Sequence, residues 1–230
     1  MVITFRVLLG ALALAAVSCA APDVASDRVP SADAQPTVQA AKAAPAPRIV
    51  FLGDSLTAGL GLAREHSVPS LIQARLNAAG YRYEVINAGV SGDTSAGGLS
   101  RLDWSLDGDV DVLVIELGAN DGLRGLPVSG IKRNLTEIVT RAKNRGVTVI
   151  LTGMEAPPNY GQAYTSEFRQ VFRDLAREHD VAFVPFYLEG VAGIPNLNQS
   201  DGIHPNPAGT RIVEQTIWRA LEPVLEKSNR

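Results

Sequence analysis

Ile49-Val50-Phe51-Leu52-Gly53-Asp54-Ser55-Leu56-Thr57 is the stretch that decides the fold. Its first four residues are all apolar and leave no polar face for water, so they predict a strand that is buried on both sides. Gly53 permits a sharp turn, after which a helix can begin. We therefore expect Ser55 at the carboxyl end of a central strand, near backbone N–H groups of a helix start. A serine placed there can attack a carbonyl carbon if a base removes its proton and donors hold the oxyanion.

Beyond this stretch, apolar strands alternate with amphipathic helices. We expect strands at residues 48–52, 83–86, 110–117, 148–152 and 182–186, and helices at 68–79, 94–104, 128–145, 162–179 and 207–227. Five strands joined by crossover helices predict one parallel α/β sheet with right-handed connections. The ligand site of such a sheet lies at the carboxyl ends of the strands. Trp104 and Trp218 fall within apolar helical patterns, so we expect both in the core.

Two later loops can supply oxyanion donors. Gly92 lies in the loop after the second expected strand, where a glycine lets the backbone approach a ligand and donate its N–H. Asn120 lies in the loop after the third strand and can offer its side-chain NH2 to the same oxyanion. Taken alone, the glycine is an ordinary turn residue and the Gly-x-Asn-Asp stretch is typical of an Asx-turn or a helix cap. We expect Asp121 to orient or cap its loop without taking part in the chemistry.

The general base is expected near the end of the chain, in Asp201-Gly202-Ile203-His204-Pro205. In a turn, an acid and a histidine three residues apart can share one side of the backbone. Asp201 can then accept from Nδ1–H of His204 and leave Nε2 facing Ser55. Pro205 favours an extended backbone at His204, which fixes where the ring points. An isolated pair of this kind is typically just a surface feature, but every candidate here follows a predicted strand and is expected at one rim of the sheet.

Pro157 and Tyr160 follow the fourth expected strand and are candidates to line the substrate pocket, although their loop could equally be only a rigid connection. Metal chemistry is not expected, since the three histidines are far apart in the sequence and Cys19 is the only cysteine. The formal net charge of the 230-residue chain is -3 and there is no basic patch, which argues against a nucleic-acid partner.

Residues 1–19 are expected to form a signal peptide. Arg6 supplies a positive charge, and the apolar run at 7–17 is too short to span a bilayer but suits a signal-peptide core. Ser18-Cys19-Ala20 fits a cleavage site between small residues. Alternatively, residues 16–19 resemble a bacterial lipobox, and the position of the lone cysteine favours lipidation of Cys19. Either way we expect export, to the periplasm, to the outer membrane as a lipoprotein, or to the medium.

The Ala/Pro-rich segment at 20–47 has no periodicity and predicts a disordered tether, so the folded domain is expected at 48–228. Such a tether suits a domain that is held off a membrane surface. It could equally be a spacer without a function of its own.

Four segments of the chain resemble, in order, the four blocks of the SGNH/GDSL hydrolases: Gly53-Asp54-Ser55-Leu56, Gly92, Gly118-Ala119-Asn120-Asp121 and Asp201-Gly202-Ile203-His204-Pro205. Residues 91–95, 120–125 and 158–161 are similar to the bacterial arylesterase and thioesterase/lysophospholipase branch. The resemblance implies a flavodoxin-like three-layer α/β/α sandwich, no cofactor, and hydrolysis of esters or thioesters. It also implies Ser55 as nucleophile and oxyanion donor, Gly92 and Asn120 as further donors, and His204 as base with Asp201 as partner.

The predicted activity is that of a serine esterase acting on small-molecule or lipid esters: aryl or short-to-medium acyl esters, thioesters or lysophospholipids. Two alternatives stay open. A carbohydrate O-deacetylase would need a polar, aromatic-rich cleft, which the 6% aromatic content does not favour. The other is a lipid-tethered module that binds without catalysis. A standard α/β-hydrolase is disfavoured, because Ser55 lacks a Gly-x-Ser-x-Gly elbow.

Overall fold

The computed structural model describes residues 45–228, which contain one five-stranded parallel sheet of order β2-β1-β3-β4-β5. The strands are β1 (Arg48–Gly53), β2 (Glu84–Gly89), β3 (Val110–Glu116), β4 (Thr148–Thr152) and β5 (Ala182–Val184). The chain runs from β1 out to β2 and then crosses back to β3 on the other side of β1, so the strand order reverses next to β1. The predicted parallel α/β fold is confirmed. The expected signal peptide, Cys19 and most of the expected tether lie outside the described residues.

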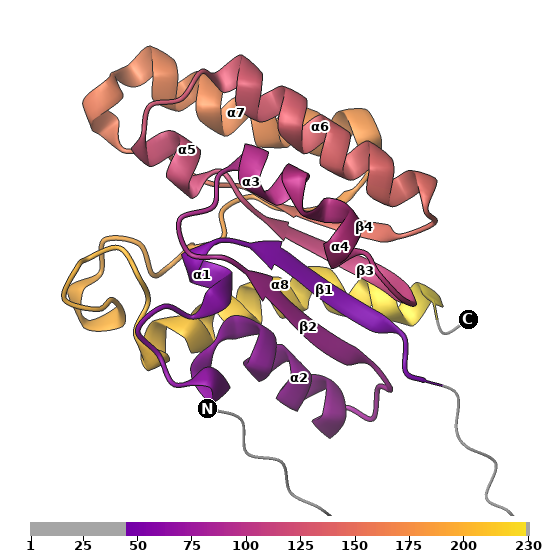
Figure 1. Cartoon of the computed structure of the whole chain (residues 1–230). Helices are drawn as coiled ribbons and strands as arrows, with labels where there is room; N and C mark the ends of the chain where they lie inside the picture. Colours follow the sequence, from indigo (N-terminus) through magenta and orange to yellow (C-terminus); the bar gives the residue numbers. More distant parts are fainter. Residues whose placement is uncertain (1–44, 229–230) are drawn as a thin grey trace, which may run out of the picture. The chain divides into compact units, whose positions relative to one another are not determined.

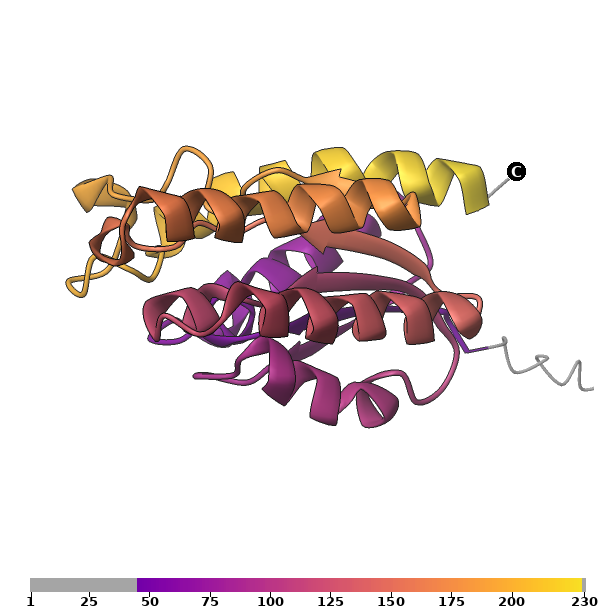
Figure 2. The same ribbon diagram turned by 90° about the horizontal axis from the view of Figure 1, so that it is seen from above.

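Helices cover both faces of the sheet and give three layers (Figures 1 and 2). α2 and α8 pack on one face, and α3, α4, α6 and α7 pack on the other. The helices are α1 (Ser55–Ala58), α2 (Val68–Ala78), α3 (Ser95–Ser100), α4 (Leu102–Ser105), α5 (Ala119–Leu123), α6 (Val128–Asn144), α7 (Gln162–His179) and α8 (Pro207–Ser228). Within residues 45–228, no helix combines the length and the apolar character that a membrane crossing requires.

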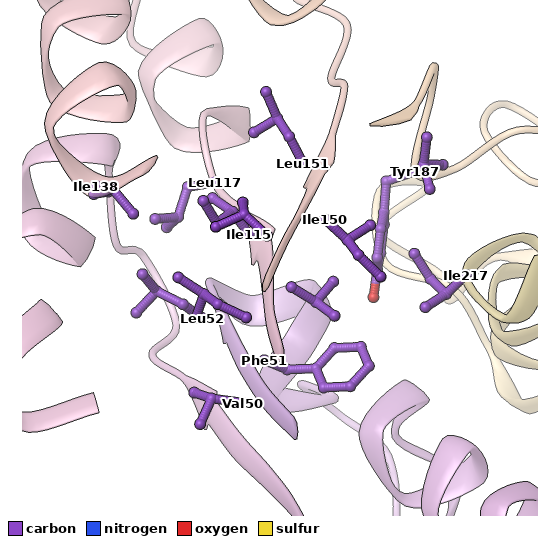
Figure 3. Close-up of a cluster of buried hydrophobic side chains, with 14 of the residues drawn as sticks. Val50, Phe51, Leu52, Ile115, Leu117, Ile138, Ile150, Leu151, Tyr187 and Ile217 are labelled. Carbon is purple, nitrogen blue, oxygen red and sulfur yellow. The ribbon is translucent and has the colours of Figure 1, made fainter. Parts of the chain in front are cut away.

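The core consists of two apolar layers, one on each face of the sheet. Phe51 points toward α8, where Tyr187 and Ile217 also lie, whereas its neighbour Leu52 points to the opposite face near Ile115 (Figure 3). All of these side chains are fully buried. Strand residues that alternate between two covered faces must be apolar throughout, which is why β1 has a continuous run rather than a polar-apolar alternation.

Three local expectations were wrong. The helix expected at 94–104 is split into α3 and α4 at Arg101, whose backbone leaves the helical conformation and whose side chain bonds to Asp93 and to the carbonyls of Ala88 and Gly53. Trp104 is 74% exposed rather than in the core, whereas Trp218 is buried as expected. β5 ends at Val184 because the next residue, Pro185, has no N–H to continue the ladder.

The carboxyl ends of the first three strands of the chain, β1, β2 and β3, lie level with one another. Gly53 at the end of β1 is in register with Gly89 at the end of β2 and with Glu116 at the end of β3. A Cβ at Gly53 would come within 2.0 Å of Thr57 Oγ1 and 2.6 Å of Glu116 Oε2, so only glycine allows the turn to fold back this tightly. The loops that follow these three strands therefore begin at the same rim of the sheet, and Ser55 lies at this rim, two residues after the end of β1.

Candidate active site

A serine, a histidine and an aspartate form one hydrogen-bonded chain at this rim of the sheet. Ser55, the first residue of α1, has its Oγ 2.8 Å from His204 Nε2, although 149 positions separate the two residues. His204 Nδ1 is 2.7 Å from Asp201 Oδ2. The side chain of His204 is only 17% exposed, so its ring is held between its two partners. The structure thus brings together the three residues that the sequence analysis selected from opposite ends of the domain.

The charge of Asp201 sets the tautomer of the ring. Hydrogen bonds from the backbone N–H of His204 and of Ile203, and then from the His204 ring, lower the pKa of Asp201 to about 2. Asp201 is therefore a carboxylate at neutral pH and can only accept, which places the proton on Nδ1 of His204. The lone pair of Nε2 then faces the Ser55 hydroxyl, as a general base requires.

The loop that carries His204 is tied to the loop that follows the serine. The Gln199 backbone N–H donates to the His204 carbonyl at 2.7 Å, and its side-chain amide donates to the Leu60 carbonyl at 2.7 Å. Asn198 and Pro205 also form an isolated antiparallel bridge. Since backbone hydrogen bonds of this kind fix main-chain positions, the imidazole is placed relative to the serine from both sides.

Asn120 lies on α5 beside the serine, with its side-chain amide donating to Asp54 Oδ2 at 2.9 Å. An amide nitrogen has two hydrogens, so the second remains for an oxyanion. Asp121 is buried and accepts from Ser95 N–H at 2.8 Å and from Ser95 Oγ at 2.7 Å. Asp121 therefore bridges the loops after β2 and β3, in agreement with its expected orienting role.

Gly92 lies in the loop after β2 with φ at +86°, a conformation that favours glycine. Its carbonyl accepts from Arg124 Nη2 at 2.9 Å. Arg101 holds the start of this loop. It forms an ion pair with Asp93 and donates to the carbonyls of Ala88 and Gly53 at 2.7 and 2.8 Å. Arg101 thereby connects the ends of β1 and β2. Neither arginine was identified by the sequence analysis, because an isolated arginine gives no periodic or motif signal.

A cavity of about 670 Å³ opens at the serine. Ser55, Asn120 and His204 line it, together with a mostly apolar wall that includes Leu56, Leu123, Met154, Phe186, Leu188 and Ile203. Pro157 lines the cavity as expected, whereas Tyr160 and Gly92 are not among its lining residues. The Tyr160 hydroxyl donates instead to the carbonyl of Leu123, which is a lining residue, at 3.0 Å.

Two buried carboxyl groups lie directly beneath the serine. Asp54 and Glu116 are both fully buried. Asp54 Oδ1 caps α1 by accepting from the Leu56 N–H at 3.0 Å, and Glu116 Oε2 accepts from the N–H of Asp54 at 3.2 Å. Neither acid has an expected role from the sequence. The available signal is an acid that directly follows a run of buried apolar strand residues, where a charge is costly. Among residues 45–228, no cluster of histidine, cysteine and acidic side chains is arranged to hold a metal ion.

Comparison with known proteins gives consistent matches over the described domain. The model of the GDSL-like Lipase/Acylhydrolase family matches residues 51–212. The esterase TesA of Pseudomonas aeruginosa is 43% identical over 79% of this chain and 91% of its own length. The thioesterase 1/protease 1/lysophospholipase L1 of Escherichia coli K12 is 34% identical over 80% of this chain and 88% of its own. A crystal structure of the psychrotrophic esterase EstA from Pseudoalteromonas sp., inhibited by monoethylphosphonate, superposes with a TM-score of 0.74 at 34% identity, covering 78% of this chain and 98% of that one.

Proposed function

The chain belongs to the GDSL-like lipase/acylhydrolase family of ester hydrolases, and we propose that it cleaves carboxylic esters through an acyl-enzyme formed on Ser55. The observation that carries this proposal is the continuous contact from Ser55 Oγ to His204 Nε2 and from His204 Nδ1 to Asp201. A neutral imidazole between a serine hydroxyl and a carboxylate is the arrangement that activates serine for acyl transfer.

The reaction follows two balanced displacements. His204 takes the hydroxyl proton as Ser55 Oγ attacks the carbonyl carbon, and the oxyanion accepts from the Asn120 amide and from the N–H groups of Gly92 and Ser55. The ester C–O bond or the thioester C–S bond then breaks, and His204 returns the proton to the leaving alcohol or thiol. A water molecule, deprotonated by the same ring, attacks the acyl carbon; the bond to Ser55 Oγ breaks, the acid leaves, and His204 returns the proton to Ser55. Loss of one oxyanion donor typically costs about 3 kcal/mol of transition-state stabilisation.

The apolar wall of the cavity supports an acyl chain as the bound group. We propose aryl esters, short-to-medium acyl esters, thioesters or lysophospholipids as substrates. A carbohydrate O-deacetylase is less well supported, because sugar binding favours polar and aromatic walls, whereas Phe186 is the one Phe, Tyr or Trp among the described residues that line this cavity.

Covalent labelling separates an esterase from a module that only binds. We expect a fluorophosphonate to modify Ser55 stoichiometrically, since a base-activated serine attacks phosphorus whereas an ordinary serine does not. Mass spectrometry of the labelled peptide, together with hydrolysis of p-nitrophenyl esters and an acyl-CoA, measures both properties. An unlabelled Ser55 in a protein that still binds esters would support the binding module instead.

A substitution on the cavity wall should shorten the preferred acyl chain. Ala192 lines the cavity and is exposed, so Ala192→Phe places a ring in the cavity without disturbing the core. We expect kcat/KM for p-nitrophenyl octanoate to fall about tenfold relative to the acetate ester, as is usual when a few methylene contacts are lost. Ala79→Phe, at the exposed end of α2, is the matched control and should leave the ratio unchanged. An equal fall in kcat/KM for the octanoate and the acetate ester would indicate that the acyl chain does not bind next to Ala192.

Export belongs to the proposal as well. The apolar run at 7–17 supports a signal peptide, and Cys19 at its end supports lipidation, with residues 20–47 as the tether that holds the hydrolase domain (48–228) off the membrane. Radiolabelled palmitate incorporation into the wild-type chain and into Cys19→Ala in a bacterial host distinguishes lipidation from simple cleavage.

A further inference from the structure

Asp54 and Glu116, the two buried acids beside Ser55, differ in the hydrogen bonds that they accept. Asp54 accepts at both oxygens, from the Leu56 N–H and from the Asn120 amide. Glu116 accepts only at Oε2, from the N–H groups of Asp54 and Thr57 at 3.2 Å each and from Thr57 Oγ1 at 2.8 Å. Glu116 Oε1 is buried and has no hydrogen-bond partner among the described residues. Both carboxyl oxygens of Asp54 therefore accept hydrogen bonds from the protein, whereas only one oxygen of Glu116 does.

Two adjacent buried carboxyl groups cannot both be charged at neutral pH, because their repulsion adds to the cost of removing each charge from water. A carboxylate at Glu116 would leave its charge uncompensated at Oε1, whereas a neutral acid there costs far less. Burial and then the charge of Asp54 raise the pKa of Glu116 well above its usual range. Burial also raises the pKa of Asp54, but hydrogen bonding with the Leu56 N–H, the Glu116 side chain and the Asn120 amide, together with the nearby His204, acts in the opposite direction. The proton therefore belongs to Glu116.

We propose that Glu116 is a positioning residue for acyl transfer: as a neutral acid it fixes the backbone of residues 54–57, and so leaves Asp54 as the single carboxylate that orients the Asn120 amide toward the oxyanion. This inference rests on the proposed function of Ser55. It adds two groups that touch no reacting atom. Glu116 acts through the hydrogen bonds that it accepts from Thr57 and Asp54, and Asp54 acts through Asn120.

The neutral state of Glu116 matters because every group around it would respond to its charge. Asp54 faces it from the N-cap position of α1, Thr57 from α1 itself, and the buried hydroxyl of Tyr187 from the segment after β5. A second negative charge at Glu116 would repel both Asp54 and the oxyanion that forms above it. We therefore expect kcat to decline on the alkaline side as Glu116 ionises, in addition to any effect of the reacting groups.

Two substitutions distinguish the proposed role from simple space filling. Glu116→Gln keeps an acceptor for the Thr57 and Asp54 donors and mimics the neutral acid, whereas Glu116→Ala removes the acceptor. We expect Glu116→Ala to lower kcat by about a hundredfold with a much smaller change in KM, and Glu116→Gln to restore most of that loss and to remove the alkaline decline. Glu214→Gln is the matched control, since Glu214 is another largely buried acid but pairs with Arg75 on α2.

The protonation state can be measured without any turnover. Infrared difference spectra of the wild-type protein minus Glu116→Gln at neutral pH should contain the C=O stretch of a protonated carboxylic acid, and the Glu214→Gln difference should not. Thermal unfolding gives a second readout. Because the pKa of Glu116 is higher in the folded state than its ordinary 4.5, the stability that this group confers is complete below about pH 4.5 and declines as pH rises. Glu116→Gln should lose that decline.

The proposal is wrong if the acid band is missing, or if Glu116→Gln is as slow as Glu116→Ala while both remain folded. Fluorophosphonate labelling of Ser55 in the same variants separates this failure from failure of the esterase assignment. If Ser55 is labelled but the carboxylic acid band is missing, the esterase assignment stands and only the proposed role of Glu116 is wrong.

Discussion

Ser55→Ala is expected to abolish ester hydrolysis while the domain stays folded. The hydroxyl is the group that becomes acylated, and among the described residues that line the cavity there is no other hydroxyl or thiol side chain. Loss of the serine in a serine protease lowers kcat by about a millionfold, and we expect at least about a ten-thousandfold loss here. The residual rate should come from water that His204 activates in the space left by the hydroxyl. The measurement is kcat/KM for p-nitrophenyl butyrate.

Folding is the necessary control for this variant. The hydrogen bond of Ser55 Oγ is made with His204 at a half-buried position, so its removal should change the melting temperature by only a few degrees. Ser166→Ala, an exposed position on α7, should keep full activity. A folded Ser55→Ala protein with more than about one percent of wild-type turnover would remove the serine from the mechanism, since no acyl-enzyme could then account for the rate.

The fold was predictable because its information is local. The apolar run at 49–52 and the glycine after it give a buried strand and a turn without reference to any other segment. The position of Ser55 at the sheet rim follows from the rule that parallel strands place their carboxyl ends together. The meeting of Ser55 with His204 then needs only that the last loop returns to the same rim, which the strand order provides.

The supporting contacts were not predictable, because they depend on the strand register and on where each side chain points, and a sequence pattern contains neither. Glu116 falls within the strand expected at 110–117, but its role depends on the register that pairs it with Gly53, next to the turn that begins α1. Trp104 has helical spacing with apolar neighbours, but the break at Arg101 turns it to solvent. Tyr160 is in the expected loop, but its hydroxyl donates to the Leu123 carbonyl and its side chain does not line the cavity.

The unpredicted residues share one physical task. Ser55 and His204 are 149 positions apart, so contacts between loops have to hold them together. A loop without such contacts would sample many conformations, and the reacting groups would rarely be in position. Arg101 ties β1 to β2, Asp121 ties the loop after β2 to α5, and Gln199 ties the histidine loop to the chain after α1. We infer that substitutions at these positions act on kcat through misplacement of the reacting groups.

Asp201→Asn is expected to be more damaging than removal of the side chain altogether. The N–H groups of Ile203 and His204 both donate to Asp201 Oδ1, at 2.9 and 3.0 Å, so an asparagine must place its oxygen there. Its NH2 group then takes the position of Oδ2 and faces Nδ1 of His204. A donor at that position forces Nδ1 to accept, which moves the ring proton to Nε2. The ring would then point an N–H at Ser55 and could not act as its base, and wrong-tautomer variants of this kind lose about 10³–10⁴ in kcat.

Asp201→Ala provides the comparison that isolates this effect, because it removes the same charge and the same contact but imposes no tautomer. His204 can then still present a free Nε2 lone pair for part of the time, so we expect a loss of only about ten- to a hundredfold. The measurement is kcat for p-nitrophenyl acetate at a pH where the ring is neutral, with thermal unfolding to verify that both variants are folded. If the asparagine variant were the faster of the two, the carboxylate would act mainly through its charge, and the fixed position of Oδ1 would have no catalytic consequence. If it is the slower, the two backbone donors of the turn determine the protonation of the catalytic ring.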